Sequence, residues 1–462
     1  MTPDADQCSL PPAQRAHRRP GGAPAIALFI ACAALLPVTG HAAGQSGKSA
    51  WAWGSNGDGE LGNGTTKNSA VPSAVATPTG VSFSVVAAGS FHSLGLDTNG
   101  HAWAWGFNGD GELGNGTTAT ATTPVSVTMP ANVTFSVVAA GGDHSVALDT
   151  SGHAWAWGFN GDGELGNGTT ANSATPVAVS MPSGVTFTAI AAGNSGQSLA
   201  IDSLGRGWGW GYNGDGELGN GTTGNSTTPV AVSMPLGVMF HAIASNGDHS
   251  LALDQSGNGW AWGKNVYGQL GNGTTKGSKT PVAVSMPGGV TFTAIAVGMF
   301  HELAVDTAGR AWAWGSSGHG QLGNGTNTNH STPTLVSMPA GVTFTALGAG
   351  ADFSLARDSN GNAWAWGYNG DGELGDGTTT STMAPVAVKM PPATTFSGIA
   401  ADGTDSDHSL ALSPDSITFG AAVPDVPSVA LLMLAGAAGS TLALRRLRRA
   451  RPNPVAAGPQ PA

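Results

Sequence analysis

The sequence predicts an all-β fold, a seven-bladed β-propeller, and three observations support this. A Trp-small-Trp-Gly tetrad recurs every 52 or 53 residues, and each period contains four short segments of strand character. A fixed period of this size is typical of repeat proteins, and four antiparallel strands per repeat are typical of a propeller blade. The repeat region also begins with a tetrad and ends with an HSLAL-type segment, so that its two ends together can complete one blade and close the ring. The tetrads start at Trp51, Trp103, Trp155, Trp208, Trp260, Trp312 and Trp364.

The second repeat illustrates the four predicted strands. TPVSVTMP (123–130) alternates and contains prolines, which an edge strand tolerates. VTFSVVAAG (133–141) and HSVALD (144–149) follow. Asp149-Thr150-Ser151-Gly152 is predicted to form the turn that leads to AWAWG (154–158), and the equivalent aspartates of the other repeats are likewise predicted to be turn residues. Within AWAWG both tryptophans lie on one face of the strand and the alanines on the other. Each blade would therefore present a bulky face to the small face of its neighbour.

The two ends of the repeat region complement each other. The first tetrad, at Trp51, has no HSLAL-type strand before it, and HSLALS (408–413) has no tetrad after it. We therefore predict that the N-terminal strand pairs with the C-terminal strand and completes the last blade. Such closure removes two exposed strand edges.

The N-terminal 1–43 resemble an export signal. Three arginines precede an apolar run at 23–38, and small residues suited to cleavage follow it. Both cysteines, Cys8 and Cys32, lie in this leader, so the exported body would contain no disulfide. The propeller domain would then occupy 44–422.

The C-terminal 423–462 are predicted to be a sorting or anchor segment. An apolar run at 429–444 precedes an arginine-rich stretch at 445–451, which the positive-inside rule places in the cytoplasm. The segment resembles the PEP-CTERM class of bacterial sorting tails, although Pro-Asp-Val-Pro stands where that class has Pro-Glu-Pro. A plain transmembrane anchor is the alternative. Both alternatives place the body outside the cytoplasm, at the cell surface.

Composition restricts the partners. Only 10% of the 462 residues are charged and 40% are hydrophobic, which argues against disorder. Without its two end segments the body keeps nine basic and 25 acidic residues, a net charge of −16. Such a body should be repelled by nucleic acid. We expect a monomer whose partners are cations, neutral glycans or basic proteins.

The repeat G-x-x-HSLAL-D-x-x-G-x-AWAWG-x-N-x-x-G-x-LG-x-G resembles the regulator of chromosome condensation repeat family, from Trp51 to about Phe419. The resemblance implies a seven-bladed propeller. It also implies nucleotide exchange on a small GTPase, an interaction module, or a secreted enzyme inhibitor, since the family includes all three. The sequence departs from the family pattern before Leu-Gly, where glutamine is kept only at Gln269 and Gln321.

The glycine-rich loops suggest several sites that their context argues against or leaves open. G-x-G-x-x-G here lies between strands without a following helix, so we expect no nucleotide cofactor. The paired carboxylates predict either weak calcium binding or a solvated acidic turn. These candidates are Asp58, Glu60, Asp110, Glu112, Asp162, Glu164, Asp215, Glu217, Asp371 and Glu373.

The histidines that open the HSLAL segments are predicted to be structural. They recur about 52 residues apart, and we expect each to make the same hydrogen bond within its own blade. They are His92, His144, His249, His301 and His408.

The fifth and sixth loops break the acidic pattern, which makes them the predicted partner-binding surface. Its candidate residues are Lys264, Val266, Tyr267, Ser317 and His319. Zinc spacing, G-x-S-x-G and a unique Ser/His/Asp set are missing from the sequence. We therefore predict an exported, surface-associated binding or scaffold module without catalysis. The alternatives are the exchange activity, an enzyme that acts on envelope polysaccharide, and an enzyme inhibitor.

Overall fold

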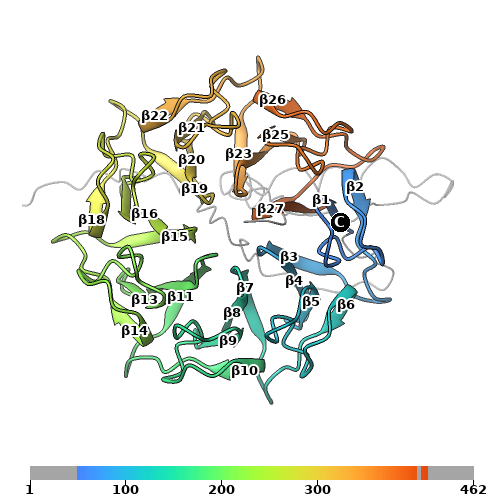
Figure 1. Ribbon diagram of the computed structural model, residues 1–462, viewed down its shortest axis with the longest axis vertical. Helices are drawn as coiled ribbons and strands as arrows, with labels where there is room; N and C mark the ends of the chain where they lie inside the picture. Colours follow the sequence, from blue (N-terminus) through green and yellow to red (C-terminus); the bar gives the residue numbers. More distant parts are fainter. Residues whose placement is uncertain (1–48, 403–406, 415–462) are drawn as a thin grey trace, which may run out of the picture. The chain divides into compact units, whose positions relative to one another are not determined.

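The computed structural model describes residues 49–402 and 407–414, and these form seven four-stranded antiparallel sheets arranged in a ring (Figure 1). The sheets are the blades, and each is named below by its strands. The predicted seven-bladed β-propeller is therefore confirmed. The innermost strand of each blade lines the centre of the ring, and the fourth strand forms the outer rim.

Each strand position recurs seven times. The innermost strands are β3 (Phe83–Ala88), β7 (Phe135–Ala140), β11 (Phe187–Ala192), β15 (Phe240–Asn246), β19 (Phe292–Val297), β23 (Phe344–Ala349) and β27 (Gly398–Asp402). The second strands are β4 (His92–Asp97), β8 (His144–Asp149), β12 (Gln197–Asp202), β16 (His249–Asp254), β20 (His301–Asp306), β24 (Phe353–Asp358) and β28 (His408–Leu412). The third strands are β1 (Ala50–Gly54), β5 (Ala102–Gly106), β9 (Ala154–Gly158), β13 (Gly207–Gly211), β17 (Gly259–Gly263), β21 (Ala311–Gly315) and β25 (Ala363–Gly367). The outer strands are β2 (Ser69–Ala74), β6 (Ala121–Ser126), β10 (Ser173–Ala178), β14 (Ser226–Ala231), β18 (Ser278–Ala283), β22 (His330–Leu335) and β26 (Thr382–Ala387).

The predicted strands of the second repeat agree with the structure in two of four cases without adjustment. β8 and β9 have the predicted bounds. The strand predicted at 123–130 is β6, which begins two residues earlier and ends at Ser126, and the chain then turns at Ala131-Asn132 toward the next blade. The proline in β6 lies on the outer edge of its sheet, where no further strand needs its missing N–H.

Ring closure follows the prediction. β1 pairs antiparallel with β28, from Ala50 opposite Leu412 to Gly54 opposite His408, and pairs with β2 on its other side. The closing blade is therefore β27-β28-β1-β2, built from both ends of the repeat region. Because the ring is closed, no blade lies at an open end of the repeat array.

The second tryptophan of each tetrad joins neighbouring blades. It is fully buried, and its indole N–H donates to the backbone carbonyl of the Glu or Gln in the preceding blade's loop, as Trp157 does to Glu112 at 2.8 Å. Its ring packs on a phenylalanine of its own blade, which opens the innermost strand in six blades and lies two residues before β27 in the closing blade, with centroids 5.9 to 6.1 Å apart. Burial of these tryptophans is worth a few kcal/mol each, so this contact is a main source of the ring's stability.

The first tryptophan of each tetrad has a different role. Trp155 is half-buried, and its indole N–H donates to the Oδ2 atom of Asp149 at 3.2 Å. The Oδ1 atom of Asp149 accepts the backbone N–H groups of Ser151 and His153, which closes the turn between β8 and β9. The aspartates that follow the HSLAL segments are therefore turn residues, as expected.

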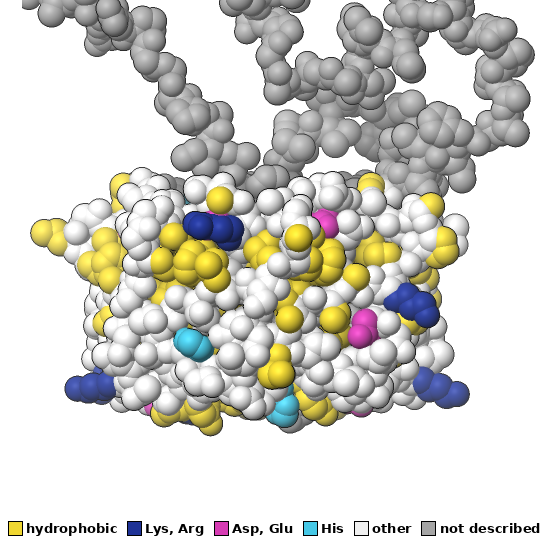
Figure 2. All heavy atoms as spheres, turned by 90° about the horizontal axis from the view of Figure 1, so that it is seen from above, with side chains coloured by type: hydrophobic (Ala, Val, Ile, Leu, Met, Phe, Trp, Pro, Cys, Tyr) yellow, Lys and Arg dark blue, Asp and Glu magenta, His cyan; other side chains and the backbone are white. Residues whose placement is uncertain are grey.

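The predicted leader (1–43) and the predicted sorting or anchor segment (423–462) lie outside the described residues. Within 49–402 and 407–414, no helix is long and apolar enough to cross a membrane. The outer wall of the ring carries few charged side chains, and these are scattered among polar and apolar ones (Figure 2).

Candidate functional site

One face of the ring carries most of the candidate site residues. We call it the loop face, because the long loops between third and fourth strands (55–68, 107–120, 159–172, 212–225, 264–277, 316–329 and 368–381) lie there. The short turns that precede the second strands lie at the same face, since each third strand ends opposite the first residue of a second strand. The central channel opens between these turns.

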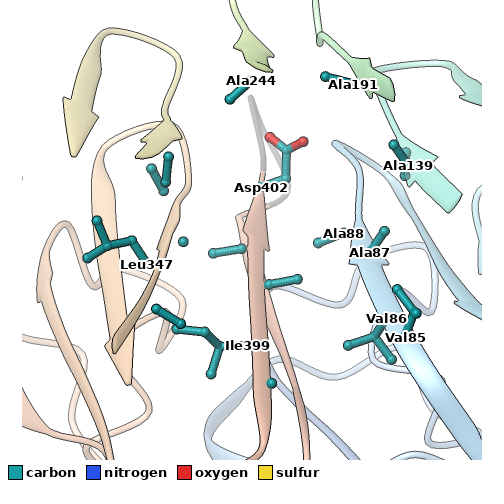
Figure 3. A pocket seen from close by; sticks show the side chains of 18 of the residues that line it. Val85, Val86, Ala87, Ala88, Ala139, Ala191, Ala244, Leu347, Ile399 and Asp402 are labelled. Atoms are coloured by element: carbon teal, nitrogen blue, oxygen red, sulfur yellow. The ribbon is translucent and has the colours of Figure 1, made fainter. Parts of the chain in front are cut away.

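The channel is an apolar cavity, and the carboxylate of Asp402 lies at the end of the channel that opens on the loop face. Its volume is about 510 Å³, and alanine, valine and isoleucine from all seven innermost strands dominate its lining. Asp402, at the end of β27, projects its carboxylate toward the middle of the channel (Figure 3). Its Oδ1 atom accepts the side-chain N–H groups of Asn194 and Asn246, both at 2.8 Å. Because these asparagines come from the β11–β14 and β15–β18 blades, the bonds tie opposite sides of the ring together.

The recurring histidines link blades, so the expectation of a bond within one blade was wrong. The Nε2 atom of His92 lies 2.8 Å from Ser145 Oγ in the next blade, and His144, His301 and His408 make the same contact. Ser145 Oγ donates to the carbonyl of Glu112, so the histidine is the donor to the serine. Burial lowers the pKa of His92 to about 3 and that of His144 to about 4, so these rings are neutral structural groups.

Three blades do not make this histidine–serine contact with the next blade. Gln197 donates to Ser245 Oγ and to the carbonyl of Gly247, and Phe353 replaces the histidine with a buried ring. His249 Nε2 faces the carboxylate of Glu302, which stands in the serine position, and both side chains are fully buried. Burial raises the pKa of Glu302 to about 7.

The glutamates of the repeat loops are buried, which corrects the prediction of a solvated acidic turn. Glu60, Glu112, Glu164, Glu217 and Glu373 are at most 2% exposed. In each, a carboxylate oxygen accepts the backbone N–H of the residue two positions earlier, at about 3 Å, so it holds its own loop closed. Burial raises the pKa of Glu112, Glu217 and Glu373 to about 7 and that of Glu164 to about 6.

The aspartates of the same loops remain at the surface. Asp215 and Asp371 are exposed, whereas Asp58, Asp110 and Asp162 are partly buried. The Oδ1 atom of Asp110 accepts the side-chain N–H of Asn172, and Asp162 is held by Asn225 in the same way. The ten predicted carboxylates are thus five buried loop-closing groups and five surface groups, not one ring of equivalent ligands.

A set of aspartates that the sequence analysis did not single out lies beside these glutamates. An aspartate directly precedes the second strand in four blades, at Asp143, Asp248, Asp352 and Asp407. Burial raises the pKa of Asp143 and Asp352, and raises that of Asp407 to about 8. The sequence contained a signal for this set, because Asp-His-Ser or Asp-Phe-Ser recurs in the repeat frame.

One group of acidic side chains in the described part of the chain comes close enough to hold a metal. Asp215, Glu217 and Asp248 place one oxygen each within 4.8 Å of one another. The Nζ atom of Lys264 lies 2.5 Å from Asp248 Oδ2 and 3.7 Å from Asp215 Oδ2, so the chain supplies a cation there itself. Lys264 was a predicted partner-binding residue, and the structure pairs its ammonium group within the protein.

The other predicted contact residues divide into exposed and buried ones. Val266 is 54% and Tyr267 41% exposed, and the Tyr267 ring lies edge-on against Phe300 of the next blade. His319 is exposed and packs edge-on against Tyr368 of the following blade. Ser317 is fully buried and donates to the carbonyl of Thr326, in the position that asparagine holds in the other loops, so it lies below any contact surface.

Family comparisons agree with the repeat and the fold. The model of the RCC1-like domain matches residues 42–354, and models of the regulator of chromosome condensation (RCC1) repeat match 344–373 and 360–412.

Relatives share parts of this sequence. The human E3 ubiquitin-protein ligase HERC2 is 35% identical over 209 residues, which are 45% of this chain but only 4% of that protein. The mitochondrial RCC1 domain-containing protein RUG3 of Arabidopsis thaliana is 31% identical over 312 residues, 62% of this chain and 70% of that protein. Among solved structures, Prp20p from Saccharomyces cerevisiae has a TM-score of 0.71 at 23% identity, covering 80% of this chain and 92% of that one. At this identity the structural likeness supports the fold alone.

Proposed function

Because the chain belongs to the RCC1-like domain family, we propose that it is a non-catalytic binding module that recognises a protein partner through its loop face. The predicted leader and C-terminal segment support a location outside the cytoplasm. Prp20p is described by its binding to Gsp1p and histones, which shows that a propeller of this fold can serve as a protein-binding platform.

The observation that carries the proposal is a set of mainly aromatic side chains from the fifth and sixth loops and from the neighbouring segments against which they pack. We call Val266, Tyr267, Phe300, His319 and Tyr368 the aromatic patch. In most other loops, glycine and aspartate stand where Val266 and Tyr267 stand here. Exposed aromatic side chains held in edge-on pairs offer large contact area with little loss of side-chain freedom on binding. The patch is therefore better suited to a protein contact than the acidic loops.

Affinity capture with a variant that restores the repeat pattern tests this function. The full chain and a Val266→Gly/Tyr267→Asp/His319→Asp variant would be immobilised and exposed to envelope and secreted fractions. The matched control is Leu204→Asn/Met239→Thr, which restores the pattern at two exposed apolar side chains far from the aromatic patch in the repeat. We expect a partner that the wild type and the control retain and the patch variant loses.

Two outcomes would contradict the proposal. Equal retention by all three proteins would exclude the aromatic patch as the contact surface. A retained species that survives protease digestion but is destroyed by periodate would be a glycan, not a protein.

A further inference from the structure

At each junction between neighbouring blades, two positions of the repeat meet on the loop face, and at some junctions both carry an acidic residue. The first is the Glu or Gln of one repeat loop, and the second is the residue that precedes the second strand of the next blade. Gln321 and Asp352 show the geometry, because Gln321 Nε2 donates to Asp352 Oδ1 at 2.6 Å. The Oε1 atom of Gln321 accepts the N–H of its own loop at the same time. The outer terminal atom of this side chain is therefore directed at the facing aspartate.

Glu112 and Asp143 occupy the same two positions at the junction of the β3–β6 and β7–β10 blades, but with two carboxylates. Glu112 Oε2 closes its own loop by accepting the N–H of Asp110. Its Oε1 atom is buried and has no hydrogen-bond partner, while Glu112 as a whole is 1% exposed. Burial, and then the charges of Asp110 and Asp143, raise the pKa of Glu112. The junction therefore has an unmet need for a donor or a cation.

The equivalent junction of the β15–β18 blade holds an ammonium group that the chain itself supplies. Asp215, Glu217 and Asp248 correspond to Asp110, Glu112 and Asp143, and Lys264 places its ammonium group against both aspartates. Burial raises the pKa of Asp248, but the hydrogen bonds from Lys264 and Ser195, together with the charge of Lys264, outweigh burial, and the pKa is lowered. The pKa of Asp143, which has no such partner, is raised by burial and by Asp110.

Phe159 stands where Lys264 stands, and it leaves the carboxylates without a cation. Its ring lies over Gly161 of its own loop, where a Cβ atom would meet it at 2.5 Å. The other junctions differ in the described part of the chain: Glu60 meets the position of Phe91 and Glu164 that of Gly196. Glu373 meets Asp407, which already accepts the N–H of Ala351.

We propose that Asp110, Glu112 and Asp143 form a site on the loop face for the ammonium group of a lysine side chain of the protein partner. We call this site the acidic pocket. The partly exposed Asp143 carboxylate accepts the ammonium, as Asp248 accepts that of Lys264, and the buried, unpartnered Oε1 atom of Glu112 adds negative charge beside it. The inference rests on the proposed function, since it assigns a chemical feature to the same partner. It also agrees with the excess of acidic over basic residues in the chain.

Calorimetric titration with a tetralysine peptide at low ionic strength tests the acidic pocket directly. Tetra-acetyllysine, which has no side-chain charge, is the ligand control. We expect Glu112→Gln, Asp143→Asn and Phe159→Lys each to weaken tetralysine binding at least tenfold. Phe159→Lys does so by supplying the ammonium from within the chain. Glu164→Gln is the matched control, because Glu164 faces a glycine, and it should bind as the wild type does.

The outcomes separate this inference from the proposed function. Absence of tetralysine binding to the wild type, or equal binding by all variants, would overturn the acidic pocket. If calcium raises the melting temperature of the wild type but not of Glu112→Gln, and tetralysine has no effect, the site is a metal site instead. The aromatic-patch variant should lose the captured partner yet keep tetralysine binding. Partner capture that depends on the aromatic patch but not on Glu112 would remove only the acidic pocket.

Discussion

The repeat loops that carry glutamate and the two that carry glutamine fold alike but differ in charge. Glu60 accepts the N–H of Asp58 at 2.9 Å, and Gln269 accepts that of Tyr267 at 2.8 Å. The tryptophan of the next blade donates to the backbone carbonyl in both cases. The fold therefore requires a side-chain oxygen at this position and does not require its charge.

The difference appears at the facing residue of the next blade. Gln321 offers an amide donor to Asp352, whereas Glu112 offers a second carboxylate to Asp143. A buried carboxylate without a partner costs more free energy than a paired amide. The Glu112 loop thus retains a carboxylate oxygen that has no hydrogen-bond partner within the described part of the chain, and this is why we assign a ligand to it.

The largest expected loss of stability concerns the buried tryptophans. It tests whether glutamate loops and glutamine loops form the same contact with the next blade. Trp157→Ala and Trp314→Ala should each reduce the free energy of unfolding by about 3–5 kcal/mol, because each removes a fully buried indole. Urea unfolding followed by circular dichroism would measure both. Trp157→Phe, which keeps most of the apolar volume, should cost clearly less. Unequal losses for the two alanine variants would break the equivalence of the junctions.

The next-largest loss of stability tests whether the repeat loop requires a side-chain oxygen at the glutamate or glutamine position. Glu112→Leu and Gln269→Leu should each cost about 1–3 kcal/mol, because each leaves a loop N–H without its acceptor. Glu112→Gln is the control and should retain the loop. A leucine variant as stable as the wild type would show that the loop hydrogen bond contributes nothing.

A smaller effect concerns the charge of the glutamates. Their pKa values in the folded protein, about 6 to 7, exceed the ordinary value of 4.5, so folding binds protons. This contribution to stability is complete below about pH 4.5 and is lost as the pH rises through 6 to 7. The melting temperature should therefore fall between pH 5 and pH 8. The Glu→Gln substitution at 112, 164, 217 and 373 should flatten that decrease, and an unchanged profile would argue against buried, ionisable glutamates.

The smallest effect concerns the sixth loop, where Ser317 replaces the asparagine of the other loops. Asn56 donates to the carbonyls of Thr65 and Lys67 and accepts the N–H of Leu61, whereas Ser317 donates to the carbonyl of Thr326. Ser317→Asn should restore bonds and raise the free energy of unfolding by about 0.5–1 kcal/mol. Differential scanning calorimetry would detect the gain. A loss of stability would mean that the loop has adapted to serine.

The sequence was sufficient to predict the ring because the ring follows from periodicity. The 52-residue repeat, the tetrads and the unpaired ends predicted seven blades and the closure by β1. The turn role of Asp149 was also predicted, because its partners lie within six residues. These features depend on neighbours in the sequence or on the period itself.

The sequence was not sufficient to predict burial within the loops. NGDGELG has the composition of an exposed turn, yet Gly111 packs against the backbone of Ala174 in the next blade, where a Cβ atom would lie 2.5 Å from its Cα. Glu112, the next residue, is 1% exposed, and no local pattern of the sequence indicates either observation. The histidine bonds were assigned to the wrong blade for the same reason, since residues 53 positions apart make them.

Closure by β1 also has a consequence for the order of events in folding. Trp51 and its hydrogen-bond partner Ser413 are separated by 362 residues, so the first blade strand to be synthesised is completed by the last. At a synthesis rate of roughly 5–20 residues per second, β1 would wait about 20–70 s for β28. During that interval Ala50–Gly54 is an apolar strand with an open edge, the kind of segment that pairs with foreign chains. Efficient production of this protein therefore depends on keeping five residues from associating until the ring can close.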